Sequence, residues 1–304
     1  MTNTIYAGGR FVDGEQATVS VFDHGLLYGD GIFEGIRAYN GRVFKLDRHL
    51  DRLFDSAQAM RLAMPWSGAD LAAIVLETCA RNGIVDGYIR LVVTRGRGDL
   101  GIDPRSCRVP ELIVIARPSM SLYASRGGIS VVTSSFRRPA PDTLCPAIKS
   151  LNYVNNVLAR MEATDRGADE ALLLDGQGYV AEATADNVFI ATGEGLVTPP
   201  CATNLKGITR ETVLEIAARL GIDAAERPFT LFDVWTAREV FVCGTGAEIV
   251  PVLKVDNRSI GSGEVGPITR RISEAYFAHV RASGTPIPSV AVSGVSRTSS
   301  GSGD

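Results

Sequence analysis

One lysine in this chain lies where a lysine could take part in covalent chemistry. Among the 304 residues, lysine occurs only at positions 45, 149, 206 and 254. Lys149 follows a proline-interrupted segment and precedes an expected helix, which is a rigid place from which to project a side chain. A lysine that attacks a carbonyl group must first lose its proton, and apolar neighbours such as Ile148 and Leu151 favour the neutral amine. Taken alone, however, Lys149 is more simply explained as a surface lysine at a helix start.

Three other segments could bind a phosphate group. Residues 205–210 (LKGITR) lead directly into an expected helix, whose free backbone N–H groups and positive dipole end attract anions. Residues 244–246 (GTG) form a turn after an apolar strand and offer backbone N–H groups with a hydroxyl. Arg52, on an amphipathic helix, is the third candidate. Each feature also has an ordinary explanation, as a helix start, a tight turn or a solvated helix face.

Glu182 is a carboxylate among apolar and small residues, in the segment 179–189 (YVAEATADNVF). A buried carboxylate needs a cationic partner. The protonated pyridine nitrogen of a cofactor is one such partner, and the pairing keeps the ring electron-withdrawing. Alone, Glu182 could equally cap Thr184 or pair with an arginine.

Hydrophobic periodicity predicts the elements that hold these segments. In the first half we expect strands at 5–12, 17–21, 31–39 and 42–45, helices at 46–61 and 68–82, and strands at 88–94 and 112–116. In the second half we expect strands at 129–136, 170–174, 187–191, 196–198 and 239–243, with helices at 153–165, 209–221 and from Pro267 onward. The pattern predicts two α+β domains, residues 1–119 and 128–283, joined by a linker at 120–127. Residues 284–304 are rich in Ser, Gly and Pro, which predicts a disordered tail.

The composition excludes several classes of protein. A formal charge of −3 and a pI near 5.7 leave no basic surface for nucleic acid. There is no apolar run of membrane-spanning length and no signal-peptide pattern, so we expect a cytoplasmic protein without membrane partners. Five scattered cysteines and three dispersed histidines predict neither a disulfide framework nor a metal site.

Six motifs occur in an order that resembles the class IV aminotransferases, which are fold-type IV pyridoxal-phosphate enzymes. They are YGDGIFEGIRAYNG (28–41), HLDRL (49–53), IKSLNYVNN (148–156), VAEATADNVF (180–189), LKGITR (205–210) and VFVCGTGAEI (240–249). The resemblance covers nearly all of residues 4–281. It implies a two-domain α+β fold like that of D-amino-acid aminotransferase, with the smaller domain at the N-terminus.

The resemblance also implies a pyridoxal 5′-phosphate cofactor and a role for each matching residue. Lys149 would carry the cofactor as a Schiff base and move a proton between the substrate α-carbon and the cofactor. Glu182 would pair with the pyridine nitrogen, and Tyr153 would hydrogen-bond the phenolic oxygen. The phosphate would be bound by Arg52, Ile208, Thr209 and Thr245, and Leu205 and Gly207 would also bind the cofactor. The substrate would be bound by Phe33, Gly35, Arg37, Tyr88, Arg90, Gly246 and Ala247, with Met120 adding to the apolar wall.

Within the family, FEGIRAY at 33–39 and YIR at 88–90 resemble the branched-chain L-amino-acid aminotransferases, with 2-oxoglutarate as the second substrate. D-amino-acid aminotransferases carry an Arg-x-His carboxylate trap where this chain has Leu100 and Ile102. A D-amino-acid or (R)-amine aminotransferase, an aminodeoxychorismate lyase and a non-catalytic cofactor-binding protein are the alternatives. The resemblance further implies a homodimer, or a higher homo-oligomer, in which Tyr28 and Ile102 reach the neighbouring active site.

Overall fold

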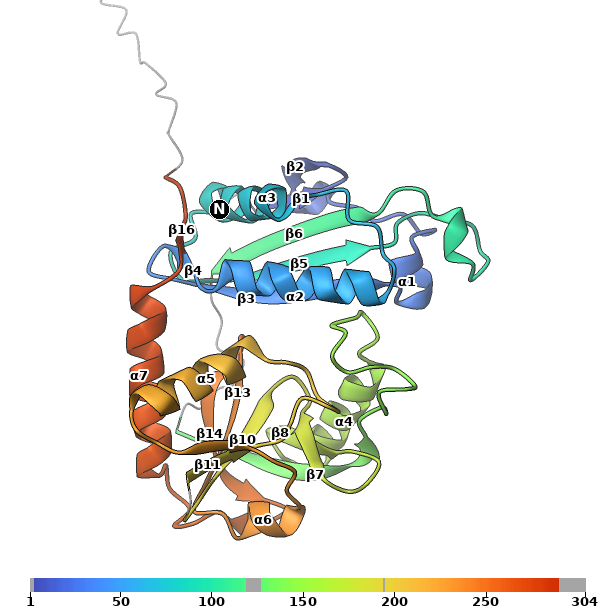
Figure 1. Ribbon diagram of the computed structural model, residues 1–304. Helices are drawn as coiled ribbons and strands as arrows, with labels where there is room; N and C mark the ends of the chain where they lie inside the picture. The colour runs from blue at the N-terminus through green and yellow to red at the C-terminus, as the bar shows by residue number, and fades with distance from the viewer. Residues whose placement is uncertain (1–2, 119–126, 194, 290–304) are drawn as a thin grey trace, which may run out of the picture.

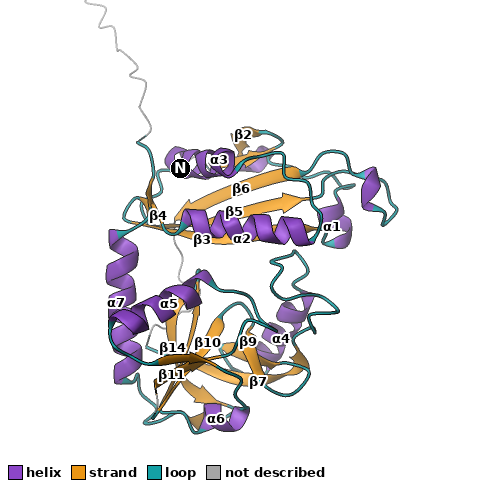
Figure 2. Cartoon of the chain, viewed as in Figure 1, coloured by secondary structure: helices purple, strands orange, loops and turns teal. Residues whose placement is uncertain are grey.

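The computed structural model describes residues 3–118, 127–193 and 195–289, and within them the strands form two sheets, one in each half of the molecule (Figures 1 and 2). The first sheet has the order β16-β4-β3-β5-β6-β1-β2. The second has the order β12-β11-β10-β13-β14-β7-β8-β9, with β15 paired to β14. This is a two-domain α+β arrangement.

The N-terminal half supplies all but one strand of the first sheet. Its elements are β1 (Thr4–Ala7), β2 (Arg10–Asp13), η1 (Gly14–Gln16), α1 (His24–Tyr28), β3 (Gly31–Tyr39), β4 (Arg42–Val43), α2 (Leu46–Ala59), α3 (Gly68–Arg81), β5 (Gly87–Thr94), η2 (Pro104–Ser106) and β6 (Glu111–Pro118).

The C-terminal half forms the second sheet and the helices around it. Its elements are β7 (Ile129–Arg137), α4 (Val154–Asp165), β8 (Glu170–Leu174), β9 (Val180–Ala183), β10 (Asn187–Thr192), β11 (Gly195–Thr198), α5 (Ile208–Arg219), β12 (Ala224–Glu226), α6 (Leu231–Trp235), β13 (Glu239–Gly244), β14 (Glu248–Val255), β15 (Arg258–Ser259), α7 (Pro267–Ala282) and β16 (Thr285–Pro286).

Alternation along β3 separates the core of the first half from the active-site side. Ile32, Ile36 and Ala38 are fully buried in an apolar cluster formed with α2 and α3. The apolar residues of α2 recur at helical spacing and face this cluster. The intervening residues of β3 point to the opposite face of the sheet, toward the second half.

The second sheet is strongly curved and has apolar residues on both faces (Figure 2). One face packs against α5 and α7 around the stacked rings of Phe189 and Phe241, which are 5.0 Å apart. The other face encloses a cluster that includes Phe229 and Val234 of the α6 region. Both faces are therefore buried, which explains why the strands read as continuous apolar runs.

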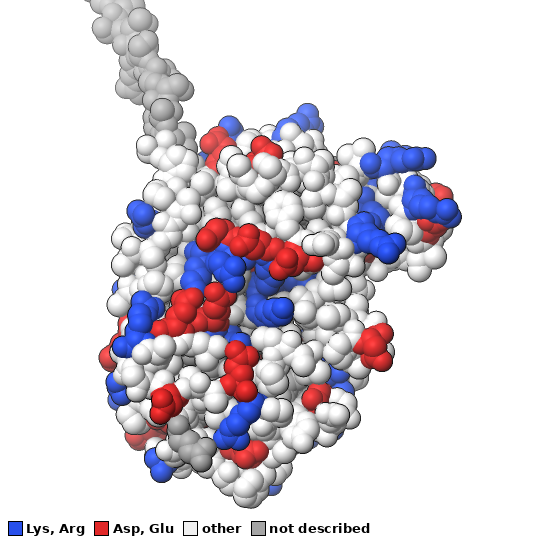
Figure 3. Space-filling model, viewed as in Figure 1, with Lys and Arg blue, Asp and Glu red and all other residues white. Residues whose placement is uncertain are grey.

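Two ion pairs join α2 of the first half to α5 of the second, and charged side chains border the junction of the halves in Figure 3. Basic side chains gather there near the junction and acidic side chains border them. Lys45 Nζ lies 2.9 Å from Glu215, and Arg48 lies 3.2 Å from Glu211, so the start of α2 is tied to α5.

The observed secondary structure differs from the predicted one in several places, among them the single strand expected at 5–12, which is the pair β1 and β2. Residues 17–21 form no strand, and their alternating valines are exposed. Strand β9 was expected to be a loop. Strand β14 was missed because Pro251 interrupts its apolar run. Pro251 is tolerated because pairing with β7 begins only at Val252, so the absent N–H removes no bond on that side.

The predicted disordered tail begins with ordered residues. Thr285 pairs with Val43 in β16, so the chain after α7 returns to the first sheet. Residues 290–304, and all of the expected linker except Gly127, lie outside the described residues.

Candidate active site

A cavity of about 590 Å³ lies between the two halves. Its walls come from β3, α2, β5 and the end of β6 on one side, and from the segment before α4, β9, the start of α5 and the β13–β14 turn on the other. Four basic side chains and two acidic ones line it: Arg52, Arg90, Arg117, Lys149, Glu182 and Asp186. The excess of positive charge favours an anionic occupant.

Lys149 lines this cavity, and its backbone groups are hydrogen-bonded to two elements of the first half, β3 and α2. Its carbonyl accepts from Phe33 N–H of β3 at 2.9 Å, and its N–H donates to Ser56 Oγ of α2 at 3.2 Å. Its Nζ lies 3.1 Å from Tyr153 Oη and 4.5 Å from the centre of the Phe33 ring. The amine therefore has a defined position between a hydroxyl and an aromatic face.

Glu182 lies on β9 and is almost fully buried. Its Oε1 is 2.9 Å from Arg138 Nε, an ion pair in which the N–H is not aligned for a hydrogen bond. Its Oε2 accepts from Leu205 N–H at 3.1 Å. Burial raises the pKa of Glu182, and Arg138, the Leu205 N–H and Lys149 oppose that rise. The carboxylate thus faces cations in a dry setting.

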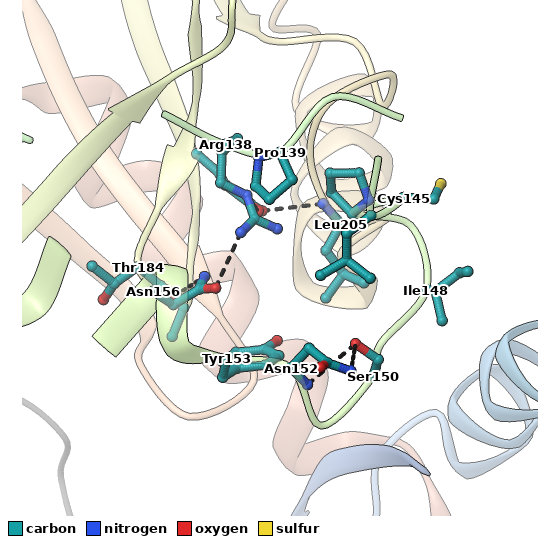
Figure 4. A pocket seen from close by; sticks show the side chains of 14 residues that line it. Arg138, Pro139, Cys145, Ile148, Ser150, Asn152, Tyr153, Asn156, Thr184 and Leu205 are labelled. Atoms are coloured by element: carbon teal, nitrogen blue, oxygen red, sulfur yellow. Dashed lines mark hydrogen bonds and ion pairs between the residues drawn. The ribbon is translucent and has the colours of Figure 1, made fainter. Parts of the chain in front are cut away.

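Arg138 is held behind Glu182 by a polar network (Figure 4). One of its guanidinium nitrogens donates to the side-chain oxygen of Asn156, drawn in Figure 4, and to that of Asn155, each at 3.1 Å. Asn156 in turn donates to the Thr184 carbonyl at 2.7 Å. These bonds attach the guanidinium to the first turn of α4, so Glu182 is supported from the side away from the cavity.

The start of α5 forms an anion site that fits the phosphate of the implied cofactor. No side chain caps this helix, and Gly207, Ile208 and Thr209 line the cavity. A Cβ on Gly207 would come within 1.9 Å of Asn187 Oδ1, so glycine is required for the backbone to pass here. Thr245, in the β13–β14 turn, lines the same end. An uncapped helix start facing a cavity is a natural phosphate site.

Arg52 reaches this end of the cavity from a buried network on α2. Its Nε and one terminal nitrogen donate to Glu34, each at 2.7 Å, and the other donates to the Lys206 carbonyl at 2.8 Å. His49 Nδ1 is 2.7 Å from the same carboxylate. Burial alone would raise the pKa of Glu34, but Arg52 and His49 outweigh it and hold the pKa at about 2. Burial lowers the pKa of His49.

The structure brings most of the predicted substrate residues into the same cavity. Phe33, Gly35, Tyr88, Arg90 and Gly246 line it with the cofactor residues. The Arg90 guanidinium lies 4.5 Å from the centre of the Phe33 ring and donates to Tyr88 Oη at 3.1 Å.

Four predicted residues do not line this cavity. Arg37 is buried beneath the β13–β14 turn, where it donates to the Gly246 carbonyl at 3.2 Å and lies 3.4 Å from Glu248. Ala247 is the last residue of that turn and is buried, lining a different pocket beside α7. Tyr28 and Ile102 are exposed, and Tyr28 Oη donates to the Leu100 carbonyl. Met120 lies outside the described residues.

Several residues of the site carried no clear signal in the sequence. Arg138 acts through contacts with residues distant along the chain, and no local pattern marks it. Glu34 stands inside the recognised motif at 28–41, but its contact with Arg52 was not predicted. Asn187 and Asp186 stand inside a motif that was recognised, but their contacts were not predicted. Asn187 Nδ2 donates to the Leu205 carbonyl at 3.0 Å, and Asp186 Oδ1 lies 2.1 Å from where a Cβ on Gly244 would be.

The described part of the chain offers neither a metal-binding cluster nor a membrane-spanning helix. No group of three or more His, Cys, Asp or Glu residues there could hold a metal ion. No described helix is both long and apolar enough to cross a membrane.

Comparison with known proteins identifies the family. Residues 31–255 match the family described as amino-transferase class IV. The chain therefore belongs to the class IV aminotransferases, as its motifs predicted. Its α+β two-domain fold is that of fold type IV, so this prediction is also confirmed.

The similar proteins are branched-chain-amino-acid aminotransferases. A Methanocaldococcus jannaschii protein provisionally given that name is 52% identical over 90% of this chain and 94% of its own length. The Pseudomonas aeruginosa enzyme is 39% identical over 90% and 91%. The crystal structure of the Thermobaculum terrenum enzyme in its PLP (holo) form has a TM-score of 0.85 and 31% identity, covering 92% and 94%.

Proposed function

We propose that this protein is a pyridoxal-phosphate-dependent branched-chain-amino-acid aminotransferase. It transfers the amino group of L-leucine, L-isoleucine or L-valine to 2-oxoglutarate, giving branched-chain 2-oxo acids and L-glutamate. The observation that carries the proposal is the placing of Lys149 in one cavity with Glu182, Tyr153 and the uncapped start of α5. The identity to aminotransferases of this specificity supports the choice of substrate.

The residues of the cavity match the chemical groups of the cofactor. Lys149 would bind it covalently through Nζ, Glu182 would meet the pyridine nitrogen and Tyr153 the phenolic oxygen. The phosphate would be held by Arg52, Thr245 and the backbone N–H groups of Ile208 and Thr209 at the start of α5. When bound, the cofactor supplies an electron-withdrawing ring that stabilises negative charge on the substrate carbon.

Lys149 and Glu182 then have separate tasks. Lys149 Nζ takes the proton from the substrate α-carbon as a general base and can return it, while Tyr153 Oη, at 3.1 Å, holds the amine in place. Glu182 keeps its charge on the cofactor side because Arg138 and the Leu205 N–H stabilise the carboxylate. Storage of a cofactor without turnover would need no such proton-carrying amine.

The substrate side combines apolar and basic surface, as two alternating substrates require. Phe33 offers an aromatic wall for an aliphatic side chain, and Tyr88 and Arg90 offer hydrogen bonds for the second carboxylate of glutamate. Leu100 and Ile102, at the positions of the D-specific carboxylate trap, carry no charge. The lack of charge at these two positions favours L-amino acids over the alternative D-amino-acid or (R)-amine substrates.

A homodimer is part of the proposal. Exposed Val154, Val157, Leu158 and Met161 recur at helical spacing on α4 and form an apolar stripe. Tyr28 and Ile102 are exposed on the other half and are available to a neighbouring subunit. Light scattering should give the mass of a dimer, and Met161→Glu should shift it toward the monomer. A monomeric wild-type protein with full activity would contradict this assembly.

The cytoplasmic location and the lack of nucleic-acid partners remain predictions.

The function is tested with a panel of amino donors. Addition of L-leucine, L-isoleucine or L-valine to the yellow protein should bleach its visible band, and 2-oxoglutarate should restore it with formation of L-glutamate. The oxo acids formed identify the donors that are used. Faster bleaching by D-leucine or D-alanine would move the protein to the D-specific group, and release of pyruvate from aminodeoxychorismate would make it a lyase.

A further inference from the structure

We propose that Arg117 forms an outer carboxylate subsite that lets this enzyme bind dicarboxylic substrates longer than 2-oxoglutarate. The inference rests on the proposed function, because it extends the substrate range of the same cavity. It concerns linear diacid chains of six or seven carbons, which carry their second carboxylate farther from the reacting amine than glutamate does.

The strand register places Arg117 on the cavity side of the first sheet. Tyr88 of β5 is paired directly with Arg117 of β6, and paired residues point to the same face. Arg90 lies two residues along β5 and therefore shares that face. All three residues line the cavity.

Arg117 is also one strand farther from Lys149 than Arg90 is. Lys149 lies against β3, through its bond to Phe33 and its contact with the Phe33 ring. Arg90 stands on the next strand, with its guanidinium over the same ring, and Arg117 stands on the strand beyond. Neighbouring strands are about 4.8 Å apart. Arg117 pairs with Tyr88 and therefore also lies two residues along the sheet from Arg90, which adds roughly 7 Å. An extended chain advances roughly 1.2 Å per bond, so one or two extra methylene groups cover about 1–3 Å of this separation, and the long Arg117 side chain must extend toward Arg90 to cover the rest.

The two arginines differ in the contacts that their guanidinium groups already make with other residues. Arg90 is half-buried, donates to Tyr88 and lies over Phe33. Arg117 is exposed and has no hydrogen bond or ion pair with any residue in the described ranges. A guanidinium binds carboxylates well through paired N–H donors. The exposed position at the edge of the cavity therefore suits a carboxylate that reaches outward past Arg90.

The test measures binding of unreactive diacids to the cofactor-loaded protein by titration calorimetry. Glutarate, adipate and pimelate have five, six and seven carbons, and hexanoate controls for added apolar length. We expect the wild type to bind adipate or pimelate at least as tightly as glutarate. Arg117→Gln should weaken the binding of the longer diacids about three- to tenfold, because the interaction with an exposed charge is partly screened by solvent. The same variant should change the affinity for glutarate less than about twofold.

Three further variants sharpen the result. Arg117→Lys should restore part of the binding, because it keeps the charge. Arg90→Gln should weaken glutarate most, and Arg10→Gln, which removes an exposed guanidinium of β2 outside the cavity, should change nothing. Matching kinetics should show a raised KM for 2-oxoadipate in Arg117→Gln with an unchanged KM for 4-methyl-2-oxopentanoate.

Each other outcome overturns the proposal. An equal loss for glutarate and adipate would mean that Arg117 shares the inner site, and an equal loss for hexanoate would exclude a role for the second carboxylate. Wild-type protein that binds adipate much more weakly than glutarate would exclude an outer subsite altogether. Bleaching by L-leucine is measured separately, so failure of the proposed function is distinguishable from failure of this inference.

Discussion

Replacing Glu34 with glutamine should both destabilise the fold and loosen the phosphate end of the active site. Glu34 is fully buried and receives two hydrogen bonds from Arg52 and one contact from His49. Glutamine would leave the Arg52 guanidinium without its counter-charge in a setting where its side chain is only 11% exposed. Breaking a buried pair on one side is costly because the remaining charge stays desolvated.

The size and the pH dependence of the effect follow from the pKa of Glu34. A pKa lowered from 4.5 in the unfolded chain to about 2 in the folded one corresponds to about 3 kcal/mol of stability at pH 7. Because the folded pKa is the lower one, this stability is present above pH 4.5 and is lost as the pH falls toward 2. At pH 3.5 about 2 kcal/mol should remain. The difference between wild type and Glu34→Gln should therefore shrink on acidification.

Urea unfolding at pH 7 and pH 3.5 measures this difference directly. Asp103→Asn is a matched control, because Arg105 holds the pKa of Asp103 at about 2 as well, but this pair is exposed and screened by solvent. The control should change stability much less. A separate titration should show weaker cofactor binding by Glu34→Gln, since Arg52 would no longer be held toward Lys206. Equal stability of Glu34→Gln and wild type at both pH values would refute the reasoning.

Three further substitutions test the active site. Lys149→Ala should lose the visible band of the lysine-bound cofactor and all transamination, while the phosphate site retains some cofactor; full activity would exclude Lys149 as the covalent attachment point. Glu182→Gln should keep its cofactor content but slow the half-reaction with L-leucine by on the order of 10²-fold, as measured by stopped-flow absorbance; a wild-type rate would leave Glu182 a structural role only. Gly35→Ala should raise KM, because its Cβ would lie 2.1 Å from Tyr88 Oη, and should reduce stability by about 1–3 kcal/mol, as overpacking does; an unchanged KM would show that Tyr88 is not needed in its present position.

The elements that the sequence predicted well are those with strong local patterns. Helices α2 and α3 and strand β3 were found within about two residues of their ends, because an apolar stripe or a long apolar run defines each of them. Strand β9 was missed because it has only four residues, VAEA, and two of them are alanines. What makes it a strand is its antiparallel pairing with β8, the strand just before it in the chain, and its own residues carry no pattern that indicates this pairing.

The predicted site was limited in a similar way. Lys149 and Glu182 could be selected because their types suit the chemistry and their motifs resemble a family. Arg138 could not, since nothing near it in the sequence indicates that it meets Glu182 across the fold. The motifs also could not distinguish Arg37 from the residues that line the cavity. Arg37 instead packs against the β13–β14 turn and donates to the Gly246 carbonyl. The first distinction depends on the packing of segments within the second half, and the second on the packing of the two halves.

Strand β3 shows how one short motif serves the core and the active site together. In FEGIRAY, Phe33 and Gly35 face the cavity, while Ile36 and Ala38 face the helices with Ile32. Glu34 belongs by register to the helix face, where an apolar residue would be expected. The Arg52 side chain extends from the helix face of the sheet to the cavity, and its guanidinium needs a counter-charge. Glu34 provides that negative charge, which explains why a carboxylate occupies this position. A register shift of one residue would place Glu34 in the cavity and Phe33 in the core. The alternation of the strand therefore keeps the negative charge of Glu34 beside Arg52 and out of the cavity.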